Sequence, residues 1–338
     1  MKEIVLAQVG CGYWGPNLMR SWRAVDGARL KWLCDLKPGR LEWARENFPG
    51  LRATADLAEA LADPEVDAVA VATEPFTHHE LGRAVLAAGK HLFMEKPLAR
   101  STAEARDLAA RAARARRVLG VGHVYLYHPA VAALRARLGS GRGGLGRPLY
   151  FDLARVNPGP PQPRHDVIWD LAPHEVSLAL DLAGAPAVAV RGTGLHWSLK
   201  VDEAAFFEIR FRNGVLARVH ASWRSHRKIR RLDAYCERGA AFFDETAAEP
   251  LTIVRPGADN RVGAKSSFKG KFSYGAGVVE TPTLEKASPL ERECADFVAA
   301  VRRGRAPRSD AALGVAVVRV LEAAARSAAA GGREVRLT

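Results

Sequence analysis

Three side chains in this sequence have the chemistry needed to move a proton: Lys96, Asp170 and His174. Histidine titrates closest to neutral pH of the ordinary side chains, which suits it to general acid–base catalysis. If a helix begins at Asp170, then Asp170 and His174 stand four residues apart and can share one helix face. Pro173 then falls in the first turn, where its missing N–H costs little. An N-cap role for Asp170 beside an incidental histidine explains the same spacing equally well.

A glycine-rich turn near the N-terminus predicts a dinucleotide site. The apolar run 4–9 enters the sequence GCGYWG at 10–15, and a helix-compatible stretch follows. Gly10 allows the tight turn, Gly12 lets the backbone approach a pyrophosphate, and Gly15 lets the helix pack closely on the strand. The helix N-terminus offers unpaired N–H groups and the positive end of its dipole to the phosphates.

An acidic residue follows at the distance expected for ribose recognition. The next apolar run stops at Asp35, about twenty residues past Gly15, where a carboxylate can accept hydrogen bonds from both adenosine ribose hydroxyls. Its charge would repel a 2′-phosphate, which favours NAD over NADP. Lys37 and Arg40 follow closely, however, and leave NADP possible.

Lys96 lies in the tripeptide Glu95-Lys96-Pro97, directly after an expected strand at 91–95. Ligands of an open α/β sheet collect at the carboxyl ends of its strands, so Lys96 is expected to project toward the nicotinamide. Partial desolvation near an oxidised nicotinamide lowers the pKa of a lysine and suits it to proton transfer. Taken alone, the tripeptide also fits a surface ion pair between neighbours.

Up to about residue 122, short apolar runs alternate with amphipathic helices, which predicts a doubly wound parallel sheet, that is, an α/β Rossmann domain. Strands are expected at 4–9, 30–34, 52–54, 66–73, 91–95 and 118–122, and helices at 38–47, 56–61, 77–88 and 101–116. Polar residues after the strands add to the glycine loop. The predicted cofactor contacts are Gly10, Gly12, Tyr13, Trp14, Gly15, Asp35, Thr73, Glu74, Pro75, His78, Glu95 and Lys96.

Residues 123–338 form the second predicted domain, of the α+β class, with a large, open and mostly antiparallel sheet. Strands are expected at 149–156, 187–196, 204–212, 215–223, 229–236 and 251–254, and helices at 130–138, from about 170, at 289–303 and at 310–329. Residues 255–288 have little periodicity and suggest an arm. The predicted substrate contacts are Lys96, His123, Tyr125, Asn157, Arg164, Trp169, Asp170 and His174.

Composition restricts the classes of protein that fit. A chain of 338 residues is long enough for two domains, and it has no apolar run long enough to span a membrane. The four cysteines lack metal-ligand spacing, so no metal site is expected and the pattern indicates a reduced, cytoplasmic setting. The net charge of +13 comes from scattered arginines and favours anionic substrates over nucleic acid, because the densest cluster, near 224–231, has few aromatic neighbours.

These motifs together resemble the Gfo/Idh/MocA family, which includes glucose–fructose oxidoreductase and inositol dehydrogenase. The resemblance covers essentially the whole chain and rests on the glycine loop, Glu95-Lys96-Pro97, Gly122-His123 and the Asp170–His174 spacing. It implies hydride transfer from a sugar carbinol carbon to nicotinamide C4, with Lys96 and His174 handling the hydroxyl proton. Asp170 would bind a sugar hydroxyl or orient the histidine. Which of Lys96 and His174 acts as the base stays open.

Within the family, the segments at 10–17 and 169–174 are similar to a subgroup often found with nucleotide sugars, some of whose members oxidise the 3-hydroxyl of UDP-N-acetylglucosamine or its uronic acid. The usual small-Pro pair is replaced here by Thr73-Glu74-Pro75, which leaves the role of Glu74 open. The leading hypothesis is therefore an NAD-dependent sugar or nucleotide-sugar dehydrogenase. The alternatives are an inositol or other polyol dehydrogenase and a non-catalytic, NAD-sensing DNA-binding regulator.

An open sheet with too few helices to cover both faces usually needs a partner. The second domain is expected to meet this need by forming a homodimer or homotetramer through its sheet.

Overall fold

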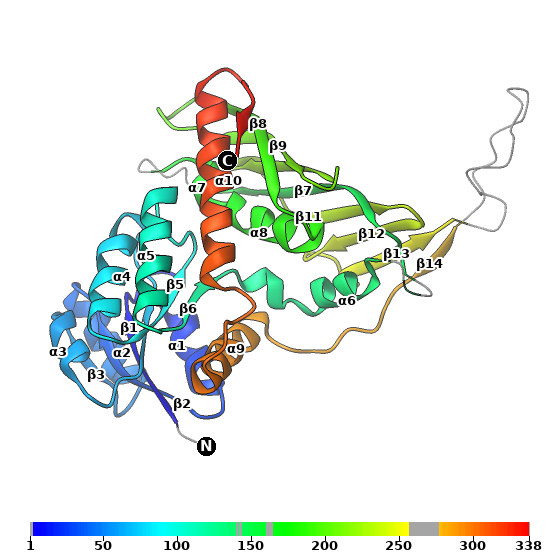
Figure 1. The fold of residues 1–338 in the computed structure, drawn as a ribbon. Coiled ribbons are helices and arrows are strands. Elements are labelled where there is room, and N and C mark those ends of the chain that lie inside the picture. Colours follow the sequence, from blue (N-terminus) through cyan, green and yellow to red (C-terminus); the bar gives the residue numbers. More distant parts are fainter. Residues whose placement is uncertain (1–2, 140, 142–143, 160–164, 257–276, 338) are drawn as a thin grey trace, which may run out of the picture. The chain divides into compact units, whose positions relative to one another are not determined.

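The computed structural model describes residues 3–139, 141, 144–159, 165–256 and 277–337. The chain divides into two units, Met1–His128 with Ala287–Glu322, and Pro129–Lys286 with Ala323–Thr338 (Figure 1). The predicted division at residues 122 and 123 assigned 287–322 to the second domain, whereas the structure places this segment in the first unit. Sequence patterns are local, and they gave no signal for this return of the chain.

The first unit contains a parallel six-stranded sheet in the order β3-β2-β1-β4-β5-β6. Its strands are β1 (Ile4–Val9), β2 (Ala28–Cys34), β3 (Arg52–Thr54), β4 (Ala68–Val71), β5 (His91–Glu95) and β6 (Leu119–Gly122). The strand order reverses between β1 and β4, so the carboxyl ends of these two strands form the switch point at which open α/β sheets bind ligands. The predicted Rossmann architecture is confirmed.

Helices cover both faces of this sheet. They are α1 (Gly15–Ala24), α2 (Pro38–Asn47), α3 (Leu57–Ala62), α4 (His78–Ala87), α5 (Thr102–Arg114) and α9 (Pro289–Arg303), with 3₁₀ turns η1 (Pro75–Thr77) and η2 (Val124–Tyr127). Side-chain caps begin three of them, because Asp56, Ser101 and Ser288 each accept a hydrogen bond from a backbone N–H of the first turn.

The returning helix α9 shares an apolar core with α1 and the sheet. The rings of Trp22, Phe93 and Phe297 meet edge to face, with centroids 5.3 to 6.0 Å apart. All three side chains are almost completely buried. Contacts of this kind contribute about 0.5–1.5 kcal/mol each beyond the burial of their apolar area. The core thereby fixes α9 against the face of the sheet that carries Phe93.

The second unit contains a nine-stranded sheet in the order β14-β13-β12-β11-β7-β10-β9-β8-β15. Its strands are β7 (Pro148–Pro158), β8 (Ala187–Leu195), β9 (Ala204–Phe211), β10 (Leu216–Ser222), β11 (Arg224–Cys236), β12 (Gly239–Asp244), β13 (Leu251–Arg255), β14 (Val278–Glu280) and β15 (Val335–Arg336). Only β7 and β10 pair in parallel, so the predicted mostly antiparallel sheet is confirmed. Strands β12, β14 and β15 were not predicted.

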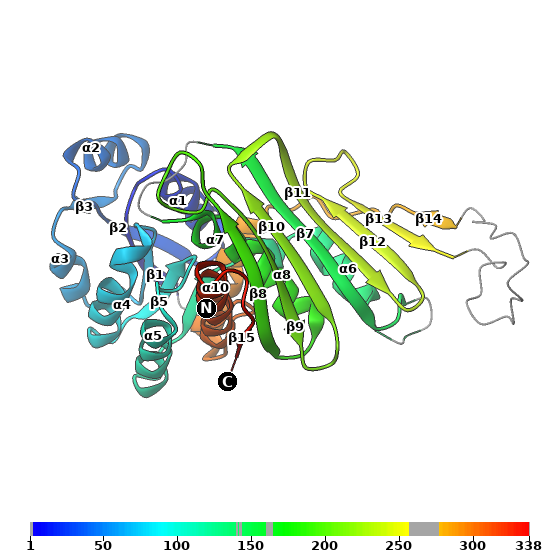
Figure 2. The same ribbon diagram turned by 90° about the horizontal axis from the view of Figure 1, so that it is seen from above.

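Three short helices belong to the second unit: α6 (Pro129–Arg137), α7 (Val167–Asp170) and α8 (Ala172–Ala183). The last helix, α10 (Ala311–Ala329), begins in the first unit and ends in the second. Figure 2 shows α6 and α8 on one face of the large sheet. Along β9 the buried side chains alternate with the exposed Phe206, Glu208 and Arg210. One face of the sheet is therefore apolar and covered, and within the described residues the opposite face is open.

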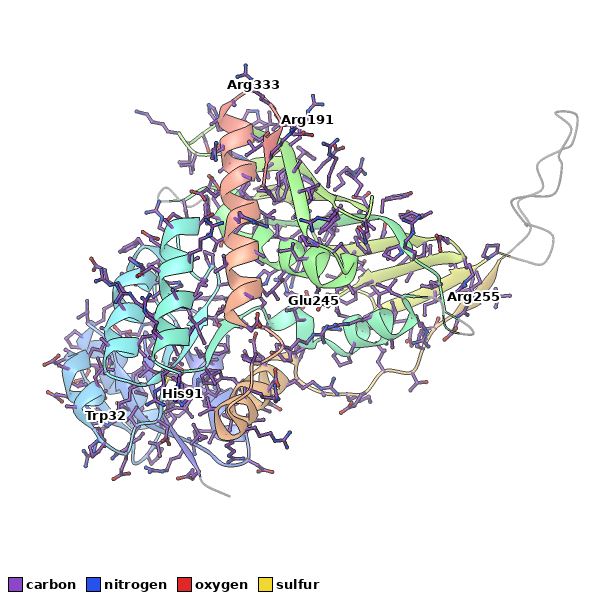
Figure 3. The ribbon with its side chains drawn as sticks, viewed as in Figure 1. Trp32, His91, Arg191, Glu245, Arg255 and Arg333 are labelled. Atoms are coloured by element: carbon purple, nitrogen blue, oxygen red, sulfur yellow. The ribbon has the colours of Figure 1, made fainter. Side chains whose placement is uncertain are left out.

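Several arginines of this unit form ion pairs with glutamates. Within the densest basic cluster, Arg224 pairs with Glu203 at 2.5 Å and Arg230 with Glu245 at 2.7 Å. Arg255, labelled with Glu245 in Figure 3, pairs with Glu280 at 2.7 Å across β13 and β14. These ion pairs offset part of the positive charge of the cluster.

Neither a membrane span nor a metal cluster is found in the part of the chain that the structure describes. No helix there is both long and apolar enough to cross a membrane. No three of its histidine, cysteine, aspartate and glutamate side chains are grouped to hold a metal ion.

Candidate cofactor and substrate sites

The glycine loop has the geometry that its sequence predicts. Gly10 has φ +96°, and a Cβ there would come within 2.5 Å of the Ala72 carbonyl oxygen. A Cβ on Gly15 would lie 2.7 Å from the Gly10 carbonyl oxygen, so the helix could not pack as closely. A Cβ on Gly12 would meet nothing within 4 Å. Gly10 and Gly15 are therefore required by the fold itself, whereas Gly12 leaves open space over the backbone for a ligand.

A buried glutamine, which the sequence analysis did not select, holds this loop. Gln8 is fully buried in β1, and its Nε2 donates to the carbonyl oxygens of Gly10 (2.9 Å) and Gly15 (3.1 Å). The two bonds join the start of the turn to the start of α1. A polar residue within an otherwise apolar strand was the only signal available in the sequence.

Asp35 also supports the loop. Its Oδ2 accepts a hydrogen bond from the Cys11 N–H at 2.7 Å, and its Oδ1 accepts one from the Lys37 N–H at 2.9 Å. Each carboxylate oxygen retains capacity for a further donor. The structure thus places Asp35 beside the glycine loop, where the sequence predicted it, and adds a structural role to the expected ribose contact.

Glu95 connects the glycine loop to the predicted catalytic lysine. Its Oε1 accepts a hydrogen bond from the Trp14 indole Nε1 at 2.8 Å, and its Oε2 accepts one from the Lys96 backbone N–H at 3.2 Å. Burial raises the pKa of Glu95 to about 7, although the nearby Lys96 acts in the opposite direction. Glu95 is only 9% exposed, so the alternative explanation of Glu95-Lys96-Pro97 as an ion pair at the surface is wrong. The peptide bond between Lys96 and Pro97 is cis.

His78 takes a different place from the one expected of a cofactor contact. The side chain is fully buried, with Nδ1 2.8 Å from the Pro97 carbonyl oxygen and Nε2 3.1 Å from that of Thr73. Burial lowers the pKa of His78, despite these two carbonyl contacts. The neutral ring can donate to only one of these carbonyl oxygens, but both nitrogens face the interior, so His78 lies between the segments after β4 and β5 and does not present a nitrogen at the surface. Thr73 is fixed further by a 2.7 Å contact between its hydroxyl and that of Thr77.

The segment that carries Asp170 and His174 is two short helices, not one. Asp166, not Asp170, caps α7, because its carboxylate accepts the Trp169 N–H at 3.1 Å. Asp170 ends α7, and its Oδ2 accepts a hydrogen bond from the Trp223 indole at 2.9 Å. The N-cap explanation for Asp170 is therefore wrong. Pro173 lies in the first turn of α8, as expected, directly before His174.

A buried ion pair that the sequence did not indicate holds α8 on the sheet. Arg155 of β7 donates to Glu175 of α8 at 2.7 Å, and their side chains are 5% and 3% exposed. Glu175 follows His174 directly in the chain. The pair therefore fixes the helix turn that presents the predicted catalytic histidine.

The remaining predicted substrate residues occupy varied positions. His123 and Tyr125 are buried in the first unit, and neither ring nitrogen of His123 has a hydrogen-bond partner among the described residues. Burial, with the nearby Lys96, lowers the pKa of His123 to about 3. Asn157 and Trp169 are half-buried in the second unit. Arg164 lies outside the described residues.

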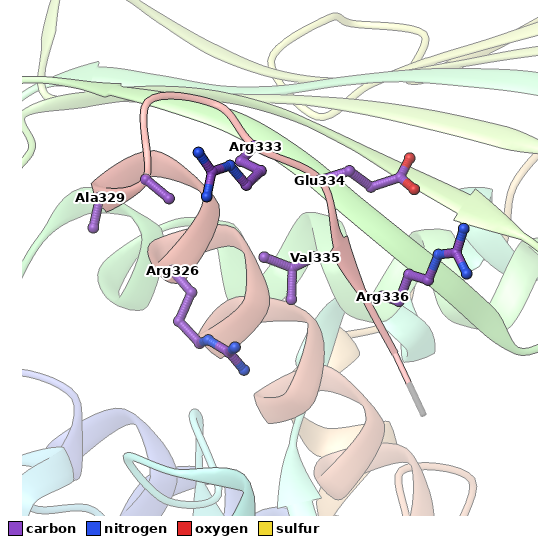
Figure 4. Close-up of a pocket in the computed structure, with 7 residues that line it drawn as sticks. Arg326, Ala329, Arg333, Glu334, Val335 and Arg336 are labelled. Atoms are coloured by element: carbon purple, nitrogen blue, oxygen red, sulfur yellow. The ribbon is translucent and has the colours of Figure 1, made fainter.

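A separate hollow of about 490 Å³ lies at the C-terminal end of the chain (Figure 4). Its lining includes Arg326, Arg333 and Arg336, together with Glu334, which pairs with Arg210 at 2.8 Å. None of the residues predicted for cofactor or substrate lines this hollow.

Comparison with known proteins identifies the family. Residues 4–123 match the family model described as an oxidoreductase family with an NAD-binding Rossmann fold, and residues 131–242 match that of the Gfo/Idh/MocA C-terminal domain. The UDP-N-acetylglucosamine 3-dehydrogenase of Acidithiobacillus ferrooxidans is 32% identical over 93% of this chain and 94% of its own length. The chain belongs to the Gfo/Idh/MocA family.

Other Gfo/Idh/MocA relatives and solved structures agree. The inositol 2-dehydrogenase of Acidothermus cellulolyticus is 34% identical, over 52% of each chain. A solved structure of the Acidithiobacillus ferrooxidans enzyme superposes with a TM-score of 0.84 at 26% identity, covering 98% of this chain and 99% of that one. GenD2 from gentamicin A biosynthesis, solved with NAD, gives 0.83 at 28% identity, covering 100% of this chain and 97% of that one.

Membership of the Gfo/Idh/MocA family establishes the general activity. The protein is a sugar-type dehydrogenase with an NAD-binding Rossmann domain, and it acts on CH–OH groups. The described residues fit the cofactor, because Gly12 leaves open space and no side chain caps the N-terminus of α1. This activity displaces the non-catalytic regulator considered from the sequence.

Proposed function

We propose that the protein oxidises a secondary alcohol of a nucleotide sugar, namely the 3-hydroxyl of a UDP-N-acetylhexosamine or of its uronic acid, with NAD as the acceptor. The observation that carries this proposal is the relative named UDP-N-acetylglucosamine 3-dehydrogenase, which matches this chain over nearly its whole length. The net charge of +13 supports a substrate that carries phosphates.

The cofactor is proposed to lie along the carboxyl ends of β1, β2, β4 and β5. Exposed apolar side chains follow three of these strands: Tyr13, Leu36 and Phe76 are 94%, 85% and 49% exposed. Isolated apolar residues on a surface need no explanation, but several at one edge of a sheet are typical of a ligand site. The proposed contacts are Gly10, Gly12, Tyr13, Trp14, Gly15, Asp35, Thr73, Glu74, Pro75, Glu95 and Lys96.

Bound NAD supplies the electron-accepting carbon C4 of the nicotinamide. The protein's own residues then have to orient the sugar and take up the hydroxyl proton. We assign the proton to Lys96 and His174, and the binding of a sugar hydroxyl to Asp170. The Trp223 hydrogen bond fixes one oxygen of Asp170, and a carboxylate oxygen can accept more than one hydrogen bond. His123, Tyr125, Asn157, Arg164 and Trp169 are the further proposed substrate contacts.

The substrate is tested by measuring NADH formation with UDP-N-acetylglucosamine, its uronic acid, other UDP-sugars and free polyols. We expect kcat/KM for one UDP-N-acetylhexosamine to exceed that for any polyol by more than about 100-fold, or about 2.7 kcal/mol. The match to inositol 2-dehydrogenase supports a polyol as the second candidate. A polyol oxidised more efficiently than every UDP-sugar would replace the proposal with that candidate.

Asp35 is expected to determine the preference for NAD. Replacing Asp35 by Asn keeps an acceptor for the Cys11 N–H but removes the charge that repels a 2′-phosphate. We expect the ratio of NADP to NAD efficiency to rise at least about tenfold, which corresponds to about 1.4 kcal/mol. Steady-state kinetics with each cofactor measures the ratio. A native enzyme that already prefers NADP would contradict this role.

The open face of the nine-stranded sheet is proposed to form a homodimer or a dimer of dimers. Tyr150 and Phe206 are each 44% exposed there, and they stack on Tyr235 and His220 with centroids 4.4 and 4.2 Å apart. Large exposed aromatic rings on an uncovered sheet face favour association.

We expect Phe206→Glu to halve the mass of the native oligomer, because a buried unpaired carboxylate is costly at an interface. Light scattering after gel filtration measures the mass. Trp197→Glu is the control, since this residue is 62% exposed and lies outside the strands. A native protein that is monomeric at micromolar concentration would refute the dimer.

A further inference from the structure

Two buried carboxyl groups of the first unit, Glu95 of β5 and Glu293 of α9, lie between the parallel sheet and helix α9. In β5, Phe93 and Glu95 are two residues apart and so point to one face of the sheet. In α9, Glu293 and Phe297 are four residues apart and so lie on one side of the helix. The rings of Phe93 and Phe297 are in contact, with centroids 5.5 Å apart.

The spacings on the two elements match. Two residues of a strand span about 6.6 Å, and four residues of a helix span about 6 Å. Later in α9, Arg302 donates to the Gly27 carbonyl oxygen directly before β2, so α9 runs from the carboxyl ends of the strands toward their amino ends. With the Phe93 and Phe297 rings in contact, Glu293 therefore lies on the Glu95 side of this contact. The charge of Glu95 acts on Glu293, which agrees with this placement.

The neighbouring strand β6 leaves room for these groups. Gly120 pairs with Phe93 and Gly122 pairs with Glu95 in the parallel register. A Cβ on Gly120 would come 2.9 Å from the Phe297 ring, and a Cβ on Gly122 would come 2.7 Å from the Glu95 carboxylate. Both positions exclude a side chain because the space above them is already filled.

The two carboxyl groups differ sharply in their partners. Glu95 accepts hydrogen bonds from the Trp14 indole and the Lys96 backbone N–H. Glu293 is 1% exposed, and neither of its oxygens has a hydrogen-bond partner among the described residues. A buried carboxylate without a donor is very unfavourable, and two neighbouring carboxylates cannot both ionise in a poorly solvated layer. If Glu95 and Glu293 together hold one proton, that proton is therefore on Glu293.

The other titratable groups around Glu293 do not supply a counter-charge. His123 is neutral because burial lowers its pKa to about 3, and burial raises the pKa values of the Tyr127 phenol and the Cys294 thiol. Although burial opposes it, hydrogen bonds from Arg308 and Arg305 keep the pKa of Asp296 below its usual range, so Asp296 adds a further negative charge. Lys96 is the cation that acts on Glu95.

We propose that Glu293 is a neutral carboxylic acid at neutral pH and serves as a positioning residue. Because Glu293 is uncharged, the buried pair of Glu95 and Glu293 carries one negative charge, on Glu95 next to Lys96. That one charge keeps Glu95 able to hold both Trp14 of the glycine loop and the Lys96 backbone. A second negative charge there would stabilise the protonated form of Lys96 and oppose the transfer of its proton. The consequence for catalysis rests on the proposed role of Lys96 in proton transfer.

The charge state is tested without cofactor or substrate. Infrared spectra of the cofactor-free protein at about pH 8 should show the carbonyl stretch of a protonated carboxyl group, at the high frequency typical of an acid without hydrogen bonds. Glu293→Gln should abolish this band. Glu104→Gln is the control, because this residue is also on a helix of the first unit but makes an exposed hydrogen bond. No band in the native protein, or an unchanged band in Glu293→Gln, overturns the proposal.

Stability gives a second readout that needs no turnover. A carboxyl whose pKa is raised on folding binds a proton more tightly in the folded state, so its contribution to stability falls as pH rises above the unfolded value. The pKa of Glu293 is raised well above that value by burial and by Glu95. Between about pH 5 and pH 8, the free energy of unfolding should therefore decline less steeply in Glu293→Gln than in the native protein. An equal slope in both proteins counts against a neutral Glu293.

Kinetics then separates the two acids. Glu95→Gln removes the charge beside Lys96. In the pH profile of kcat/KM, the midpoint of the limb that reports proton transfer by Lys96 should fall by about one unit or more. Glu293→Gln should shift that midpoint by less than about a third of a unit, because it replaces one neutral group by another. An equal shift in both variants overturns the proposal. Failure of every substrate tested would refute the proposed function but leave the infrared and stability results to decide on Glu293.

Discussion

Replacing Lys96 by Met is expected to lower kcat by about 10² to 10⁴-fold, the range that a positioned acid–base group contributes. Methionine keeps the length and apolar stem of lysine but cannot carry a proton. The Glu95 carboxylate accepts from the backbone N–H of residue 96, so the hydrogen bonds that hold the glycine loop remain. NAD affinity should therefore change by less than about fivefold, or about 1 kcal/mol.

Turnover is measured by NADH absorbance and NAD affinity by calorimetric titration. Lys37→Met is the control, because Lys37 is an exposed lysine near the cofactor edge and is assigned no catalytic role. Its kcat with NAD should stay within about twofold of the native value. If Lys96→Met retains native activity, proton transfer through Lys96 is refuted. If both NAD binding and turnover are lost, Lys96 serves the cofactor instead.

Replacing Arg155 by Met is expected to lower the free energy of unfolding by about 3–5 kcal/mol, because it leaves the buried Glu175 without its counter-charge. Burial raises the pKa of Glu175 even with Arg155 present, and removing the arginine raises it further. A carboxyl with a raised folded-state pKa costs stability as pH rises above its unfolded value. The loss should therefore be larger at about pH 8 than at about pH 5.

Denaturant titration at the two pH values measures these losses. Arg218→Met is the matched control: Arg218 pairs with Asp152 at 2.6 Å on the same sheet, but its side chain is 62% exposed, so the cost should be at most about 1 kcal/mol. Adding Glu175→Leu to Arg155→Met should recover most of the loss, since apolar groups of similar volume replace buried ion pairs well. Equal losses in Arg155→Met and Arg218→Met would show that the buried pair has no special importance.

The structural features that the sequence predicts correctly are local. The glycine loop and Asp35 lie within one strand–turn–helix–strand unit, in which steric contacts require Gly10 and Gly15, and Gly12 leaves space above the backbone. Strand and helix positions in the first unit followed from short-range periodicity for the same reason. The helix predicted at 289–303 is also observed, as α9.

The contacts that the sequence could not predict join distant segments. The Trp14–Glu95 hydrogen bond depends on which strands lie side by side in the sheet. The Arg155–Glu175 pair depends on how α8 packs on β7, and no pattern in either segment indicates it. Glu293 reads as one more charged residue of an amphipathic helix. Only the return of α9 to the first unit shows that this carboxyl is buried.

His78 and Asp170 show how local patterns mislead. A histidine after a strand end fits a cofactor contact, yet the His78 ring is fully buried and both of its nitrogens face backbone carbonyl oxygens. Asp170 fitted an N-cap, but α7 begins earlier because Asp166 caps it. The Trp223 indole, from the bend between β10 and β11, donates a hydrogen bond to the Asp170 carboxylate. In both cases a long-range hydrogen bond decides the role of the side chain.

The central claim is that a hydride leaves carbon 3 of the sugar in a UDP-N-acetylhexosamine or its uronic acid. It is tested most directly with the substrate deuterated at carbon 3, by mass analysis of the reduced cofactor after turnover. We expect NADH that carries one deuterium at nicotinamide C4, together with the 3-keto nucleotide sugar. Reduced cofactor without deuterium, or no turnover of either nucleotide sugar while a free polyol is oxidised, would contradict the proposed function.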